Sequence, residues 1–421
     1  LRNTQRNAAW RIIQSAKVLL DHCVGAGKTF TIITGVQERV RMGLTRKAMI
    51  VVPNHLVGQW AADYMKLYPG ARILAATKKD FTRSNRRRLF ARIATGKYDA
   101  VIVGHSSFGF IPMETESVTN LIMEEIEHLE RAHAQAEESG NKRLIKSLAK
   151  RIQKKRERIK ELLGRERDNV TNFEAMGIDH LIVDESHEFK NLEYSSAMQN
   201  ITGMGNPMGS KKAFDLYSKI RWLTAQKDYA LNFATGTPIS NSLVELYALL
   251  RYMNREALVA RGLEAFDAWA SSYAAIENKI EYTATQKLKD RTIMSTFNNL
   301  RELLQLYKEF ADTVTMDDLK RIYAEQIRER NARTGGNESE EFPIPHVEGG
   351  GRVLDVADAT EEQAEYVDYL VARAETLEEQ GGSADPKIDN HLWIMSDARK
   401  MALDIRLVDP YAPDHPNNKI N

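Results

Sequence analysis

The sequence predicts an α/β fold, in which helices cover both faces of a parallel sheet. Short apolar runs alternate with stretches of helical periodicity, which is typical of parallel strands joined by crossover helices. Segments rich in glycine, acidic or hydroxyl-bearing residues follow several of these runs. This is expected at a ligand site, because the carboxyl ends of parallel strands meet at one edge of the sheet. The expected strands are residues 17–20, 48–52, 72–75, 100–103, 180–183 and 229–234.

The composition is that of a globular protein with two or three folding units. Of 421 residues, 43% are apolar and 28% are charged, which is ordinary for such a chain. No run of about 18 uncharged apolar residues occurs, so we expect no membrane partner. The single Cys23 excludes an internal disulfide and suits the reducing cytoplasm. Because the net charge is only +1, nucleic-acid binding has to be inferred from local surfaces.

The first expected strand leads into a glycine loop. Residues 21–30 read Asp-His-Cys-Val-Gly-Ala-Gly-Lys-Thr-Phe, and a helical stretch follows. Gly25 and Gly27 let the backbone turn and direct its N–H groups at phosphate oxygens, as in phosphate-binding loops. Lys28 supplies a positive charge, and Thr29 supplies a hydroxyl for magnesium. The loop predicts a nucleotide site, with a ligand-free helix start as the alternative.

The strand expected at residues 180–183 ends in an acidic pair. The sequence continues Asp184-Glu185-Ser186-His187. In a nucleoside triphosphatase, Asp184 would hold magnesium, usually through water, and Glu185 would orient and deprotonate the attacking water. Two acids after an apolar run are also common at solvated strand ends. Combined with the glycine loop, the pair is predicted to form the second half of one site.

Two further strand ends complete a pattern. Residues 50–60 read as strand, turn and helix, and residues 232–241 read as a strand followed by a Thr-Gly-Thr-Pro turn. With these blocks the sequence resembles the superfamily-two helicases, most closely the SWI/SNF-type DNA translocases. The matching segments are motif I at 25–29, Ia at 51–60, Ib at 98–105, II at 184–187 and III at 235–238, with Lys190-Asn191 and Asn241-x-x-x-Glu245-Leu246 as tighter marks of the SWI/SNF group.

The resemblance implies a RecA-like P-loop lobe that binds and hydrolyses ATP with Mg²⁺ and acts on duplex DNA. The nucleotide-binding residues would be Gln5, which reads adenine, and Gly25, Ala26, Gly27, Lys28, Thr29 and Phe30. The catalytic residues would be Lys28, Asp184, Glu185 and His187, with Thr29 and Asp184 holding Mg²⁺. Thr235, Gly236 and Thr237 would couple the nucleotide to DNA, which Pro53, Asn54, His105 and Ser106 would contact.

The sequence also departs from the family pattern. Ser186 replaces the usual small third residue of motif II, and His22 and Cys23 replace an acidic pair. His22 also stands where the strict loop pattern has glycine. No segment matches motifs IV to VI, so we expect a fragment of a longer protein whose second motor lobe is a partner. Residues 399–410 resemble phage- or plasmid-borne proteins that join this motor to an adenine-methylating DNA module, which suggests a linked methylase and a bacterial or phage context.

An insertion at residues 113–169 interrupts the lobe expected over residues 1–250. Its first arm is mostly acidic, its second is mostly basic, and apolar residues at heptad spacing predict an antiparallel helical hairpin. Lys155 fills one apolar slot of that heptad. The hairpin is either a self-neutralising protrusion or an arm that contacts DNA or a partner. The second alternative is open because the cations of the basic arm exceed what the acidic arm alone would neutralise. Residues 203–212 are either a phosphate contact or a plain surface loop.

The rest of the chain is expected to be helical and then to lead toward the second lobe. Residues 242–330 read as almost wholly helical, which defines a helical region at 251–331. Residues 332–421 read as linker and connector, with a linker at 332–351, a strand at 352–356 and a helix at 360–379.

These expectations converge on the ATP-hydrolysing motor lobe of a SWI/SNF-like duplex-DNA translocase. Alone, the chain is expected to turn over ATP weakly or not at all, because the second lobe contributes arginines. The alternatives are a strand-separating or restriction-type helicase lobe, a nucleotide-binding module without turnover, and a purely structural scaffold.

Overall fold

The structure is a computed structural model, and it describes residues 2–138, 140, 142–164, 171–196, 198, 201–240, 242–282, 288–343, 356, 358–379 and 389–415. Its internal contacts divide the chain into two units. One unit comprises residues 1–277 and 293–342, and the other comprises residues 278–292 and 343–421. The candidate site lies in the first unit.

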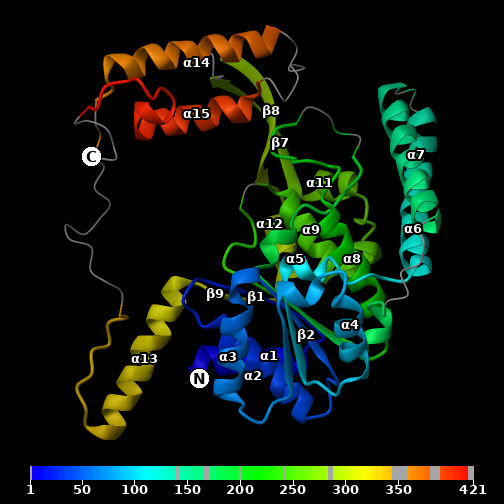
Figure 1. The fold of residues 1–421 in the computed structure, drawn as a ribbon, viewed down its shortest axis with the longest axis vertical. Coiled ribbons are helices and arrows are strands. Elements are labelled where there is room, and N and C mark those ends of the chain that lie inside the picture. The colour runs from blue at the N-terminus through cyan, green and yellow to red at the C-terminus, as the bar shows by residue number, and fades with distance from the viewer. Residues whose placement is uncertain are drawn as a thin grey trace. The chain divides into compact units, whose positions relative to one another are not determined.

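A seven-stranded sheet forms the centre of the first unit (Figure 1). The strand order is β3-β4-β2-β5-β6-β1-β9, and all pairings are parallel. The strands are β1 Lys17–His22, β2 Ala48–Val52, β3 Ile73–Ala76, β4 Ala100–Gly104, β5 His180–Asp184, β6 Ala230–Thr235 and β9 Ala311–Val314. The α/β fold with a parallel sheet is therefore confirmed, and all six expected strands are present.

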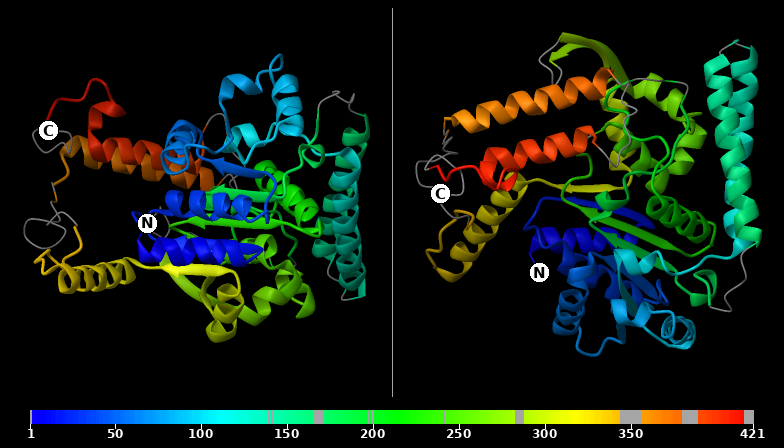
Figure 2. Two further views of the ribbon diagram at one scale, coloured as in Figure 1. Left: turned by 90° about the horizontal axis from the view of Figure 1, so that it is seen from below. Right: turned by 45° about the horizontal axis from the view of Figure 1, so that its top comes forward.

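Alternate residues of the strands enter two apolar cores. Leu20 and Ile50 pack with helices α1 Asn3–Gln14, α2 Lys28–Arg41 and α3 Val57–Leu67. Leu19 and Val51 belong to the other core, which includes α4 Arg86–Thr95, α8 Lys211–Thr224 and α9 Val244–Met253. Figure 2 shows helices on both sides of the sheet. Two-sided burial explains why the strands read as continuous apolar runs.

The insertion forms the predicted helical hairpin. After the short α5 His105–Phe108, helix α6 Thr115–Glu138 and helix α7 Lys142–Gly164 lie side by side (Figures 1 and 2). Their seam contains buried apolar residues from the predicted heptad, including Ile122, Leu129, Leu148, Ile152 and Ile159. Between the two helices Gly140 has a φ of +68°, and residues 139 and 141 lie outside the described residues.

The region after α9 is less helical than expected. It contains α10 Arg255–Ala260, α11 Phe266–Tyr273, α12 Leu300–Lys308 and α13 Met316–Thr334, but also the strands β7 Ala274–Tyr282, β8 Leu288–Phe297 and β9. The expectation of an almost wholly helical stretch is wrong for these three strands. β7 and β8 form a two-stranded sheet, and Ile293 of β8 makes one isolated parallel bridge with Thr202. Ile276 and Ile280 of β7 are exposed, so β7 lacks the buried apolar pattern that would mark it in the sequence. β9 is too short to show a period.

In the second unit, α14 Glu361–Glu379 and α15 His391–Leu403 share a small apolar core built around Leu370, Ala374 and Ile394. The helix expected at 360–379 is confirmed. Most of the strand expected at 352–356 and residues 344–351 of the expected linker lie outside the described residues, and α13 extends to Thr334 at that linker's start. Among the described helices, none has the length and apolar character needed to span a bilayer.

Candidate functional site

The predicted motifs lie at one edge of the sheet because their strands are parallel and in register. Asp21 at the end of β1 is opposite Thr235 on β6, and Asp184 on β5 is opposite Ala234. Val52 on β2 is opposite Gly104 on β4. The segments that follow these strand ends are the glycine loop, the turn at Pro53, the start of α5, the acidic pair and the Thr-Gly-Thr turn. Residues distant in sequence thus share one carboxyl edge, where α/β folds bind ligands.

The glycine loop has a backbone conformation that favours glycine at two positions. Gly25 and Gly27 adopt left-handed φ values of +88° and +84°, which L-residues with a side chain rarely adopt. Helix α2 begins at Lys28, directly after the loop, so Thr29 and Phe30 lie in its first turn. The unpaired N–H groups at such a helix start favour a bound anion.

Gln5 lies against this loop, although α1 precedes β1. Its Nε2 donates a hydrogen bond to the Gly27 carbonyl oxygen at 3.1 Å, and its Oε1 accepts one from the Arg2 backbone at 2.8 Å. A Cβ at position 27 would lie 2.2 Å from Gln5 Nε2. The residue expected to read adenine is therefore in direct contact with the loop expected to hold the phosphates.

Lys28 and the acidic pair converge. The Lys28 ammonium donates to the His22 carbonyl oxygen at 2.9 Å, and Gly236 is so close that a Cβ there would lie 3.7 Å from Lys28 Nζ. Burial, and next the charge of Glu185, raise the pKa of Asp184 to about 6, while Lys28 and a hydrogen bond from the Trp60 side chain oppose the rise. Lys28 thus lies beside the turn after β6, at the same strand ends as the Asp184 carboxyl group.

Glu185 has an unusual backbone. Its φ of 48° and ψ of 49° are left-handed, a conformation that is costly for a residue with a side chain. Such strain is found preferentially at functional sites. This conformation separates the side chains of the pair, because Asp184 is buried whereas Glu185 is partly exposed.

His187 connects the acidic pair to the Thr-Gly-Thr turn. Its Nδ1 lies 3.0 Å from Thr235 Oγ1 and 3.2 Å from Glu185 Oε2. Thr235 Oγ1 also accepts the Thr237 backbone N–H at 3.1 Å. His187 and Thr235 thus join the acidic pair to the turn after β6 by side-chain contacts.

A second link joins the same two segments. Lys190 Nζ lies 2.9 Å from Glu245 Oε1, and Glu245 Oε2 accepts the Ser240 backbone N–H at 2.7 Å. Lys190 also donates to the Ser240 hydroxyl. The two sequence marks that follow motifs II and III thus meet in space, and Asn241 lies outside the described residues.

The residues expected to contact DNA lie at the same edge of the sheet. His105 Nε2 donates to the Asp184 carbonyl oxygen at 2.8 Å, and burial lowers the pKa of His105. Asn54 Oδ1 accepts hydrogen bonds from the backbone and hydroxyl of Ser106 at 3.2 and 2.9 Å. Pro53 precedes the short 3₁₀ helix that contains Asn54. Their contact with DNA stays a prediction.

His22 has a structural partner that the sequence pattern did not indicate. Its buried Nε2 lies 2.7 Å from Asp312 Oδ1 on β9. Burial alone would raise the pKa of Asp312, but the hydrogen bond and charge of His22 outweigh it and lower that pKa. Nearby, Asp21 Oδ2 accepts a hydrogen bond from the Tyr307 hydroxyl at 2.9 Å. The sequence separation of these pairs leaves no local signal for them.

The donors present fit a magnesium–nucleoside triphosphate. The loop offers backbone N–H groups and the Lys28 ammonium to phosphates. Asp184 and Thr29 offer oxygen ligands of the kind that Mg²⁺ prefers. Glu185, partly exposed beside them, could position a water molecule.

A family model described as a probable helicase domain matches residues 10–315, which is most of the chain. No curated protein matches the chain. Among solved structures, the SWI2/SNF2 ATPase core of Sulfolobus solfataricus in complex with dsDNA is similar, with a TM-score of 0.39 and 13% sequence identity over 75% of this chain. Our chain covers 44% of that one.

Proposed function

The chain belongs to the family of probable helicase domains, and from this premise we propose that it is the ATP-binding and ATP-hydrolysing lobe of a duplex-DNA translocase. The observation that carries the proposal is that the glycine loop after β1, the acidic pair at the end of β5 and the turn after β6 lie at one carboxyl edge of the sheet, which follows from the parallel register of these strands. In the proposed protein a second lobe supplies the arginines that complete the site. A linked methylase module and a cytoplasmic location in a bacterium or phage-infected cell remain proposals as well.

The proposed binding step uses the glycine loop. Gly25, Ala26, Gly27 and Lys28 bind the phosphates through backbone N–H groups and the lysine ammonium, while Gln5 reads the adenine beside Gly27. Binding then requires the Lys28 ammonium to exchange its contact with the His22 carbonyl oxygen for phosphate oxygens. Thr29 and Asp184 hold Mg²⁺, which supplies charge neutralisation at the phosphates.

The proposed hydrolytic step uses the acidic pair. Glu185 orients a water molecule and accepts its proton, and His187 keeps the Glu185 carboxylate in place. The contacts from His187 to Thr235, and from Thr235 to Thr237, carry the state of the site to the turn after β6. His105 bonds the carbonyl oxygen of Asp184, and Ser106 bonds Asn54. These three residues, which we propose face the DNA, therefore lie at the same sheet edge as the hydrolytic site.

Nucleotide binding by this chain tests the first step. We expect a fluorescent ATP analogue to bind in the presence of Mg²⁺, and Lys28→Ala to abolish that binding. Lys97→Ala is the matched control, because Lys97 is exposed and precedes β4 at the opposite edge of the sheet. Equal binding by the two variants would remove the glycine loop from the mechanism.

Turnover by the full-length protein tests the second step. We expect duplex DNA to stimulate ATP hydrolysis, and Glu185→Gln to slow it by about 10²–10⁴-fold, the range for loss of a general base, while binding is retained. Stimulation by single strands alone would instead indicate a strand-separating helicase. Unchanged turnover in Glu185→Gln would exclude the proposed water-activating role.

A further inference from the structure

Helix α7 carries a row of four exposed lysines. Lys142, Lys146, Lys150 and Lys154 follow one another at intervals of four residues, so they share one face of the helix at a spacing of about 6 Å. None of the four side chains makes a hydrogen bond or ion pair with another described residue. Like charges at this spacing destabilise a helix slightly, which a bound anion would relieve.

The acidic arm neutralises other cations of α7. Lys155 lies 2.6 Å from Glu125, and Arg156 lies 2.7 Å from Glu130, both on α6. The guanidinium of Arg158 stacks over the Phe214 ring at 4.1 Å. Among the described residues, Lys155, Arg156 and Arg158 of α7 thus have partners, whereas the four lysines of the row have none. A self-neutralising hairpin would not leave such a row uncompensated.

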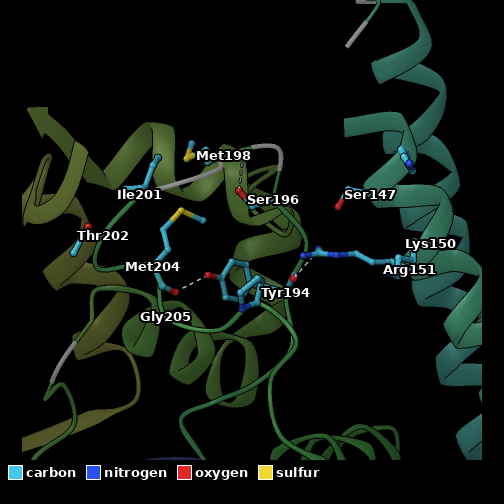
Figure 3. A pocket seen from close by; sticks show the side chains of 12 residues that line it. Ser147, Lys150, Arg151, Tyr194, Ser196, Met198, Ile201, Thr202, Met204 and Gly205 are labelled. Atoms are coloured by element: carbon cyan, nitrogen blue, oxygen red, sulfur yellow. Dashed lines mark hydrogen bonds between the residues drawn. The ribbon is translucent and has the colours of Figure 1, made fainter. Parts of the chain in front are cut away.

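Part of the lysine row lines a trough. A cavity of about 750 Å³ is lined on one side by α7 and on the other by described residues between Tyr194 and Pro207. Figure 3 shows the lining side chains of both sides. Its lining residues include the cations Lys146, Lys150 and Arg151 and no acidic side chain. Ser147 lies on the α7 side and Thr202 on the other, and each offers a hydroxyl group. The Ser196 hydroxyl is already bonded to Asp267.

The wall opposite α7 is held in place. Arg151 Nη1 donates to the Tyr194 carbonyl oxygen at 3.2 Å, and the Tyr194 hydroxyl donates to the Met204 carbonyl oxygen. The Met294 backbone N–H bonds the Thr202 carbonyl oxygen at 2.9 Å. A Cβ at Gly203 would lie 2.4 Å from the Met294 carbonyl oxygen, so the loop and β8 are in close contact. These contacts fix the wall of the trough opposite α7.

We propose that the lysine row of α7 and this trough bind the phosphodiester backbone of nucleic acid. Lys142 and Lys154 are separated by about 18 Å along the helix, which is longer than a compact anion needs and suits a linear polyanion. Lysine ammonium groups act as point charges and bind phosphate without reading bases. The choice of duplex DNA as the nucleic acid rests on the proposed function, but the binding itself needs no ATP.

The test is the binding of labelled duplex DNA, without nucleotide, over a range of salt concentrations. We expect Lys146→Gln/Lys150→Gln to weaken binding roughly tenfold at physiological salt and to reduce the salt slope by about 2, since each neutralised phosphate contributes about 0.9. Lys97→Gln/Lys227→Gln is the matched control, because both lysines are exposed and precede strands β4 and β6 at the other sheet edge. An unchanged slope in the trough variant would overturn the proposal.

Two further measurements distinguish nucleic-acid binding at the trough from nucleotide binding at the glycine loop and from binding of acidic proteins. Lys28→Ala is expected to bind DNA like the unaltered protein, so loss of nucleotide binding and loss of the trough are distinguishable. Polyglutamate, an acidic polypeptide, is expected to compete poorly. If it bound as tightly as DNA with the same dependence on Lys146 and Lys150, the site would take acidic proteins and the nucleic-acid assignment would be wrong.

Discussion

The two left-handed glycines of the loop have different surroundings. Open space lies beyond Gly25, whereas the position of a Cβ at Gly27 is occupied by the Gln5 amide. Gly25 thus needs only its backbone freedom, while Gly27 also makes room for the side chain that is expected to read adenine. A side chain at position 27 should therefore weaken nucleotide binding in addition to straining the backbone.

We therefore expect Gly27→Ala to impair nucleotide binding more than Gly25→Ala. Both substitutions meet the cost of about 1–2 kcal/mol for a left-handed residue with a Cβ. Only Gly27→Ala also displaces Gln5, so its affinity for a fluorescent ATP analogue should be lower by roughly a further factor of ten, which is about 1.4 kcal/mol.

Gln5→Ala provides the control for this prediction. Combined with Gly27→Ala, it removes the clash, so the double variant should lose less than the sum of the two single losses. Strict additivity in this double-mutant cycle would show that Gly27 and Gln5 act independently.

Individual site residues were the easiest part to predict from the sequence. Gly25, Gly27 and Lys28 stand together, and Asp184 and Glu185 follow an apolar run, so short local patterns reveal them. The partner of His22 could not be found this way. Asp312 is 290 residues away, and no local pattern encodes a pairing between distant strands. The same applies to the Lys190–Glu245 link, whose halves appeared only as separate family marks.

Among the elements, the hairpin shows how a charge can occupy an apolar slot. Lys155 falls in the heptad seam and is 8% exposed. Its ammonium lies 2.6 Å from Glu125 and 2.9 Å from Glu193, so it ties α7 both to α6 and to the segment that follows the acidic pair. Removing one partner of a buried ion pair leaves the others uncompensated in a low-dielectric environment.

We expect Lys155→Ala to destabilise the first unit by about 3–5 kcal/mol, the usual cost of breaking a buried pair. Chemical denaturation followed by circular dichroism measures this difference. Arg156→Ala is the matched control on the next residue: Arg156 and its partner Glu130 are exposed by 57% and 45%, and such surface pairs contribute about 0–1 kcal/mol. Similar losses in both variants would contradict a structural role for the buried pair.

Elements were predictable where burial imposes a period. All six expected strands and the hairpin are present. β2, β4, β5 and β6 are buried along their whole length, buried residues alternate with partly buried ones in β3, and the hairpin has a heptad. β9 was missed because only Ala311 of its four residues is buried. Its Asp312 and Thr313 instead make polar contacts with His22 and Asp21. Side-chain pairing across the sheet, and not an apolar pattern, marks this strand.

At the scale of the whole molecule, the net charge is nearly zero although positive and negative residues are concentrated in different segments. The net charge of +1 reflects acidic and basic arms of one hairpin and many ion pairs. What a partner would meet is therefore determined by which charges remain unpaired, such as the lysine row, and not by the total.

The stability of the sheet-containing unit has a pH dependence that originates in its interior. His180 on β5 is fully buried, its Nε2 donates to Asn232 Oδ1 on β6, and its Nδ1 lies 3.4 Å from the Thr45 hydroxyl. Burial, and next the charge of Arg39, lower the pKa of His180 to about 3, while the hydrogen bond to Asn232 opposes this shift. The folded protein thus keeps this imidazole neutral.

We predict that this histidine makes the folded protein sensitive to acid. An unfolded chain protonates it near pH 6.5, so between about pH 6.5 and 3 the unfolded state binds one proton more than the folded state. Stability then falls as the pH decreases through this window, by about 1.4 kcal/mol per pH unit, and is unaffected by this group above it. His180→Gln retains an amide donor for Asn232 and cannot titrate, so its unfolding free energy should change less steeply between pH 6 and 4. Identical slopes in the two proteins, or a His180 imidazole NMR signal that titrates near pH 6.5 in the folded protein, would contradict the prediction.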